Sequence, residues 1–112
     1  MTYRVRFRGI ESSAALREHA ERRLHRQLGR YRQQITSVAL RLTDINGPRG
    51  GSDKQCQITV RGGSGIGSVD VSVTHEDAYA AVDLAMERVR RAVGRSIQRS
   101  REPRRPAASV AG

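Results

Sequence analysis

Apolar and polar residues alternate in four stretches of the chain, and in two other stretches apolar residues recur every three or four positions. Strict alternation is typical of a strand with one buried face, whereas the longer spacing is typical of an amphipathic helix. The alternating stretches predict strands over Thr2–Arg8, 35–43, 54–61 and 68–74. The helical spacing predicts a helix over 14–32, with Ser13 as its N-cap, and a second helix over 76–99.

Each predicted helix carries one apolar stripe. The first stripe consists of Leu16, Ala20, Leu24, Leu28 and Tyr31. The second consists of Ala78, Val82, Ala85, Val89, Val93 and Ile97. Thr74 and Asp77 form a weak capping box at the start of the second helix, and Gly94 interrupts that helix at a cost of ~1 kcal/mol relative to Ala. We therefore expect its last turns to fray.

These elements follow the order β-α-β-β-β-α, which is an α+β arrangement. Two helices laid on one face of a four-stranded sheet would bury every apolar stripe and leave the other sheet face in solvent. The helix between the first two strands favours a parallel, right-handed crossover, and the loops between the later strands favour antiparallel pairing. The sequence therefore predicts a mixed sheet with both helices packed on one face, similar to the layout of double-stranded-RNA-binding domains.

We expect one folded domain over residues 1–99, because 112 residues leave no room for a second sizeable domain. Residues 100–112 carry Pro103 and Pro106 and nothing to pack, which predicts a disordered tail. The stretch 44–53 is rich in turn residues and is predicted to be mobile. No window approaches the ~20 consecutive apolar residues of a membrane span, and the lone Cys56 fits a reducing compartment. We expect a cytoplasmic protein with no membrane partner.

The chain is strongly basic, with 21 Lys and Arg residues against 11 Asp and Glu residues and a net charge of +10. Lys54 is its only lysine. Arginine holds phosphate in a bidentate manner and stacks on bases, so this composition favours a polyanionic partner, with nucleic acid the first candidate.

The arginines gather on one flank of each predicted helix. On a wheel of 100° per residue, the acidic residues Glu18, Glu21, Asp83 and Glu87 are predicted to lie on the opposite sides. Like charges stacked four residues apart cost ~0.2–0.5 kcal/mol per pair, and a phosphate-rich partner would turn that repulsion into binding. The candidate RNA-binding residues are Arg22, Arg23, Arg26 and Arg30 of the first helix and Arg88, Arg91, Arg95 and Arg99 of the second.

A further basic set is predicted on the open sheet face, and it has two interpretations. These arginines could bind RNA, or they could keep a bare sheet soluble and blunt its edge. The set consists of Arg4, Arg6 and Arg8 with Arg41 and Arg61. Arg49 and Lys54, in and after the turn-rich stretch, are further possible contacts to RNA backbone.

No other chemistry is indicated by the sequence. The segments GPRGG and GGSGIG lack the lysine and hydroxyl residue that end a phosphate-binding loop. His19, His25 and His75 show no metal-ligand spacing and are expected in solvent, although His19 could add a hydrogen bond within the arginine flank. Cys56 alternates inward and is expected to be a buried, inert thiol. We predict a non-enzyme with no cofactor, metal or small-molecule substrate.

Two segments resemble the ribosome hibernation-promoting factor family, also called ribosome-associated inhibitor or protein Y. EDAYAAVDLAMERVRRAVGR (76–95) is similar to the family's second-helix pattern, and SAALREHAERRL (13–24) is similar to its first-helix opening. The resemblance covers residues 2–99. The segment NGPRGGSDKQC (46–56) departs from the short turn of common members and indicates a variant branch of short-form proteins.

The resemblance implies the fold predicted above and a ribosomal function. It implies binding to ribosomal RNA of the small subunit, in the channel for messenger RNA and the A- and P-site transfer RNAs, which holds ribosomes inactive in stationary phase or stress. It implies contacts from the basic residues of both helices and a monomer off the ribosome. Tyr79 and Asp83 match the family pattern, and we expect Tyr79 to pack at the helix start and Asp83 to orient a neighbouring arginine.

Two other functions stay open on the sequence alone. A general double-stranded nucleic-acid-binding module would have the same net charge and a related layout. An adaptor protein would act through the open sheet and the turn-rich stretch, with the charge incidental.

Overall fold

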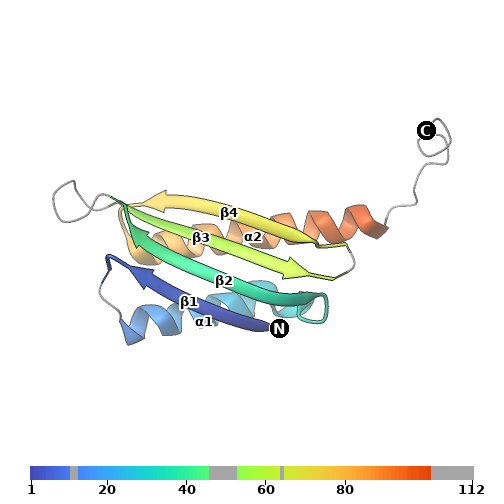
Figure 1. The fold of residues 1–112 in the computed structure, drawn as a ribbon, viewed down its shortest axis with the longest axis horizontal. Coiled ribbons are helices and arrows are strands. Elements are labelled where there is room, and N and C mark those ends of the chain that lie inside the picture. Colours follow the sequence, from blue (N-terminus) through green and yellow to red (C-terminus); the bar gives the residue numbers. More distant parts are fainter. Residues whose placement is uncertain (11–12, 46–52, 64, 102–112) are drawn as a thin grey trace.

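The computed structural model describes residues 1–10, 13–45, 53–63 and 65–101 (Figure 1). The predicted order of strands and helices is confirmed, with one short 3-10 helix, η1, added after the first helix. The elements are β1 (Thr2–Arg8), α1 (Ala14–Leu28), η1 (Gly29–Tyr31), β2 (Ile35–Asp44), β3 (Lys54–Gly62), β4 (Ser68–His75) and α2 (Ala78–Arg101).

The strands form one sheet in the order β1-β2-β3-β4. β1 pairs with β2 in parallel, and the two later pairings are antiparallel, as predicted. Figure 1 shows α1 and α2 together on one side of this sheet, which confirms the predicted two-layer arrangement. The opposite face of the sheet is left uncovered by helices.

The core lies between the sheet and the two helices. Both predicted helical stripes face it, with Tyr31 and Ala78 only partly buried at its margin. α2 also buries Ala81 and Met86, so its apolar face is wider than predicted. The largest fully buried side chains are aliphatic, as expected of a chain with one phenylalanine: Leu24, Leu28, Leu40, Leu42, Ile58 and Met86.

The helix ends show where local chemistry differs from the prediction. Ser13 caps α1, because its Oγ accepts the Leu16 amide at 3.2 Å. The predicted capping box before α2 does not form, since Thr74 belongs to β4 and α2 begins only at Ala78. Instead, the Asp77 amide donates to Nδ1 of His75 at 2.9 Å.

α2 stays helical through Gly94 to Arg101, so the expected fraying does not occur among the described residues. Gly94 has a packing reason, because a Cβ there would lie 3.1 Å from the Tyr31 hydroxyl oxygen. Gly65, in the turn between β3 and β4, adopts a φ of +91° and lies against the end of α2. A Cβ on it would collide with the Oγ of Ser100. These two glycines therefore let η1 and the β3–β4 turn approach the C-terminal half of α2.

α1 and α2 run side by side in the same direction, as Figure 1 shows. His19 near the start of α1 contacts Tyr79 near the start of α2, and Tyr31 of η1, which follows α1, lies beside Gly94 in the second half of α2. This follows from the topology, since each helix returns antiparallel to a strand and the strands β1, β2 and β4 share one direction.

Two predictions fall largely outside the described residues, although Ser100 and Arg101, the first residues of the predicted disordered tail, belong to α2. The turn-rich stretch 44–53 includes residues 46–52, among them Arg49, and most of the predicted tail is residues 102–112. At the near ends of the turn-rich stretch, the Ile45 amide donates to the Asp53 carbonyl at 3.2 Å.

Candidate nucleic-acid interface

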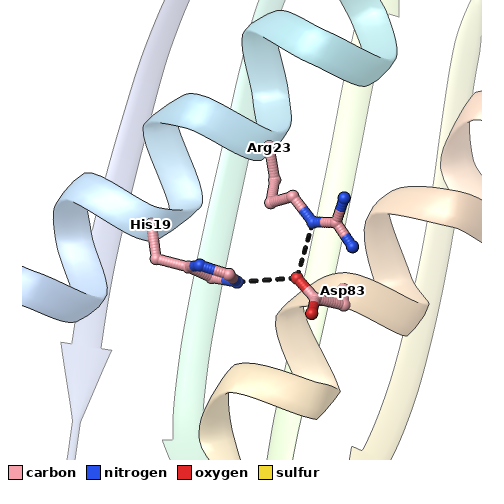
Figure 2. Close-up of polar contacts among 3 residues, drawn as sticks. All are labelled: His19, Arg23 and Asp83. Carbon is pink, nitrogen blue, oxygen red and sulfur yellow. Dashed lines mark hydrogen bonds and ion pairs between the residues drawn. The ribbon is translucent and has the colours of Figure 1, made fainter.

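Asp83 of α2 joins the two helices at a polar contact that we call the helix seam, made by His19, Arg23 and Asp83 (Figure 2). One carboxylate oxygen of Asp83 lies 2.6 Å from Nε2 of His19 and 2.7 Å from Nε of Arg23. The His19 ring also meets the edge of the Tyr79 ring, with the centroids 4.9 Å apart. Because a carboxylate only accepts hydrogen bonds, both α1 side chains donate to it.

The seam changes the acidity of its members. Burial raises the pKa of Asp83, but the hydrogen bonds and charges of Arg23 and His19 outweigh this, so its pKa lies below the ordinary 3.8. The hydrogen bond to Asp83 likewise raises the pKa of Arg23. Asp83 is thus an anion held by two donors, and the prediction that it orients a neighbouring arginine is confirmed.

The expectation of solvated histidines is wrong for His19, whereas His25 is exposed as expected and His75 is half-buried. The predicted hydrogen bond of His19 beside the arginine flank does form, to Asp83. Only 22% of the His19 side chain is exposed, because α2 covers it at the seam. The His25 ring packs edge-on against Tyr3 at 6.0 Å, and His75 accepts a backbone hydrogen bond at the start of α2. These partners could not be predicted from the sequence, since each lies on another element or depends on where α2 begins.

The predicted separation of acids from arginines is also wrong in part. Glu18 pairs with Arg22 at 2.9 Å, and Glu87 pairs with Arg91 at 2.7 Å. Residues four apart on a helix are neighbours on its surface, so these carboxylates lie beside the arginine flanks rather than opposite them. Together with the seam, they pair three of the eight predicted helix arginines with acids of the same chain: Arg22, Arg23 and Arg91.

The other five, which we call the open arginines, have no carboxylate within 4.0 Å among the described residues. All five are exposed. Arg30 lies over the Tyr31 ring at 5.4 Å, and Arg99 donates to Oγ of Ser96 at 3.4 Å. The open arginines are Arg26 and Arg30 near the end of α1, and Arg88, Arg95 and Arg99 along α2.

The two arginine flanks face different directions. The flank of α1 borders the seam, where Arg22, Arg23 and Arg26 line a hollow with His19, His25 and Asp83. Asp83 marks the side of α2 that faces α1, and Arg88 and Arg95 lie about 120–140° around the helix from it. The flank of α2 therefore lies on the side away from α1, so the helix layer presents cations at two places.

The secondary basic set has mixed placements. Arg4, Arg6 and Arg41 line a groove on the uncovered face of the sheet. Arg8 and Arg61 are exposed on β1 and β3. Lys54 forms an ion pair within the chain, with its Nζ 3.6 Å from a carboxylate oxygen of Asp44. Arg49 lies outside the described residues.

Other chemistry finds no site in the described part of the chain. No group of three His, Cys, Asp or Glu side chains there could hold a metal ion. Cys56 is fully buried, as predicted, and burial raises the pKa of its thiol to about 12. None of the described helices is both long and apolar enough for a membrane span.

A family model identifies the family of this chain, and two solved structures share its fold. A family model described as sigma 54 modulation protein / S30EA ribosomal protein matches residues 3–101. No curated protein matches the chain. A ribosomal subunit interface protein from Coxiella burnetii has a similar structure, with a TM-score of 0.71 and 24% identity over 85% of this chain and 96% of that one. The protein Y N-terminal domain from Thermus thermophilus gives a TM-score of 0.67 and 24% identity over 82% and 93%.

Proposed function

Because the chain belongs to the sigma 54 modulation protein / S30EA ribosomal protein family, we propose that it binds the small ribosomal subunit and blocks translation there. The family consists of non-enzymatic, ribosome-associated hibernation and inhibitor factors. The finer proposal concerns where this chain binds and which side chains hold it. It places the helix layer against ribosomal RNA, in the channel for messenger RNA and the A- and P-site transfer RNAs.

The observation that carries this proposal is the set of open arginines. Five exposed guanidinium groups on α1, η1 and α2 lack an acidic partner in the described part of the chain, although Glu18, Asp83 and Glu87 neutralise their neighbours. Each open guanidinium can hold a phosphate through two hydrogen bonds. Binding would also release the counterions condensed on RNA, which favours association most at low salt.

Inhibition follows from occupancy. Contacts made to phosphates and sugars fix position without reading base sequence, so recognition depends on the shape of the folded RNA. A protein held there excludes transfer RNA and messenger RNA by volume alone, and no bond is made or broken. The helix seam contributes as a positioning contact, because the bridge from Asp83 to His19 and Arg23 fixes one arginine flank relative to the other.

The decisive experiment reverses the charge of the α2 flank. The triple variant R88E/R95E/R99E should lose at least about tenfold in affinity for purified small subunits, measured by co-sedimentation over a series of salt concentrations. The dependence of log affinity on log salt should become shallower by about 2 to 3, because three phosphate contacts are lost. The matched variant R88K/R95K/R99K keeps the charge and should keep most of the affinity.

Two further measurements separate this proposal from general duplex binding. Excess transfer RNA with messenger RNA should displace the wild-type protein from small subunits, and bulk double-stranded RNA should compete poorly. Equal affinity for bulk duplex RNA and for small subunits would favour the general nucleic-acid-binding module. Unchanged co-sedimentation of the folded R88E/R95E/R99E variant would overturn the assignment of the α2 flank.

A further inference from the structure

We propose that the uncovered face of the sheet is a second RNA-binding surface, which holds the sugar–phosphate backbone of a single RNA strand along β1 and β2. The surface is a groove of about 420 Å3, on the side of the sheet opposite the helices. Its lining includes the cationic side chains of Arg4, Arg6 and Arg41 and the polar side chains of Gln57, Thr59 and Ser72. The protein would then contact RNA both through its helix layer and through the uncovered face of its sheet.

The positive charge of this face is concentrated, and Asp70, the acid that shares the groove, forms no ion pair with its arginines. Arg6 and Arg41 are direct partners in the register of β1 and β2, so two like charges stand side by side. Such a pair destabilises a sheet, and among the described residues no carboxylate lies within ion-pair distance of either guanidinium. Asp70, the acid of the groove, accepts the Thr59 hydroxyl at 2.5 Å instead of pairing with an arginine.

Edge protection does not account for the arrangement. β1 is an edge strand, and charged residues such as Arg4 and Arg6 do guard an edge against pairing with another chain. Arg41, however, lies on β2, which is hydrogen-bonded on both sides by β1 and β3. A cation there protects no edge and faces the cation of Arg6, so a ligand that carries negative charge is the better explanation.

The chemistry of the groove indicates a nucleic acid backbone rather than a protein partner. Protein interfaces are centred on large aromatic and aliphatic anchors, and no aromatic side chain lines this groove. Its aliphatic lining is limited to Ala39, Leu40 and Val71, of which Leu40 is already buried in the core. Arginine forks match phosphate, while amide and hydroxyl groups such as those of Gln57 and Ser72 match the ribose 2′-hydroxyl. Alternate residues on a strand repeat every ~6.6–6.8 Å, which gives a row of cations parallel to the chain of phosphates.

Because no aromatic ring is available for base stacking, this surface should bind all base sequences with similar affinity. The inference rests on the proposed function only in naming RNA as the partner. Its residues are separate from the open arginines, so each surface can be removed while the other is kept.

The test uses the full chain and a short, end-labelled oligouridylate. The probe's affinity is measured by fluorescence anisotropy, and its position by amide chemical shifts in β1, β2 and α2. In the R88E/R95E/R99E background, the probe should still shift the amides of Arg6 and Arg41 and bind through the sheet. Adding R4E/R6E/R41E to that background should weaken binding at least about tenfold, whereas R4K/R6K/R41K should keep it.

The outcomes distinguish this inference from the proposed function. If R4E/R6E/R41E leaves the probe's affinity unchanged, or if the probe shifts only helix amides, the sheet surface is overturned while the helix flanks stand. If polyglutamate of the same charge binds the groove as tightly as the oligouridylate, the surface recognises charge alone and the RNA assignment is overturned. If R88E/R95E/R99E loses small-subunit binding while the oligouridylate still binds the sheet, the result supports both the proposed function of the helix flanks and the second surface on the sheet.

Discussion

Arg23 and Arg95 are the same residue type on neighbouring helices, and their surroundings differ in a way that composition hides. Arg23 is about 29% exposed and donates to Asp83 at the helix seam, where its charge is used inside the molecule. Arg95 is exposed and has no acidic partner among the described residues. The net charge therefore overstates the number of arginines available to RNA. Whether an arginine is paired with an acid of the same chain distinguishes those that stabilise the fold from those that are free to bind.

The largest effect on stability should come from removing the acid of the seam. Asp83→Ala leaves Arg23 and His19 without their shared acceptor in a partly buried site. Hydrogen bonds to charged groups contribute about 1.5–3 kcal/mol when buried, so we expect a loss of about 1–2 kcal/mol here, because the seam is partly exposed. The free energy of unfolding from urea titrations measures this loss.

The matched variant on the α2 flank, where the arginine has no acidic partner among the described residues, is Arg95→Ala. It should change the free energy of unfolding by less than about 0.5 kcal/mol, since its guanidinium contacts no acid of the described chain. It should instead weaken binding to small subunits. Equal destabilisation by the two substitutions would contradict the distinction between seam and flank.

A smaller effect should appear in the acid dependence of stability. The pKa of Asp83 is lowered below 3.8 in the folded protein, so the unfolded chain binds more protons in that range. The contribution of the seam is therefore complete above about pH 4 and is lost as the pH falls through the lower, folded pKa. The difference in unfolding free energy between wild type and Asp83→Asn should shrink as the pH drops below about 4.

Urea midpoints of both proteins over that acid range provide the measurement. A difference that grows on acidification would contradict the assignment of Asp83 as the bridging anion.

The smallest effect should come from freeing an arginine that is now paired. Glu87→Gln removes the exposed partner of Arg91, and surface pairs of this kind contribute about 0.2–1 kcal/mol at most. We expect stability to change within that range and affinity for small subunits to rise by roughly twofold at low salt. Glu18→Gln, which frees Arg22, is the parallel variant on α1. Weaker binding by both would show that these acids help the interface rather than mask it.

The fold was predictable from the sequence because its signals are local and redundant. Four alternating stretches and two helical stripes each require one buried face, and only a layered arrangement satisfies all of them. The errors lie at the ends of elements, where one hydrogen bond decides. His75, rather than Thr74, receives the Asp77 amide, and α1 gives way to η1 after Leu28.

The site was predictable only in part, because a helical wheel orders residues around one axis and says nothing about the neighbouring helix. It placed the arginines on flanks, but the pairing of Arg23 and His19 with Asp83 depends on how α1 and α2 pack. The error over Glu87 was avoidable, since a spacing of four residues to Arg91 already makes the two neighbours. The crowding of Arg6 against Arg41 depends on strand register, which periodicity does not fix.

The common direction of α1 and α2 has a consequence for how the molecule approaches a polyanion. Acids such as Glu18 and Asp83 lie in the first half of each helix, whereas the second halves carry Arg26, Arg95 and Arg99, and Arg30 follows α1 in η1. Since the helices are parallel, their basic halves coincide and the protein acquires a lengthwise electric dipole. The negative electrostatic field of a ribosome would orient the protein before contact, with its basic end toward the RNA. The association rate would therefore increase as the ionic strength falls.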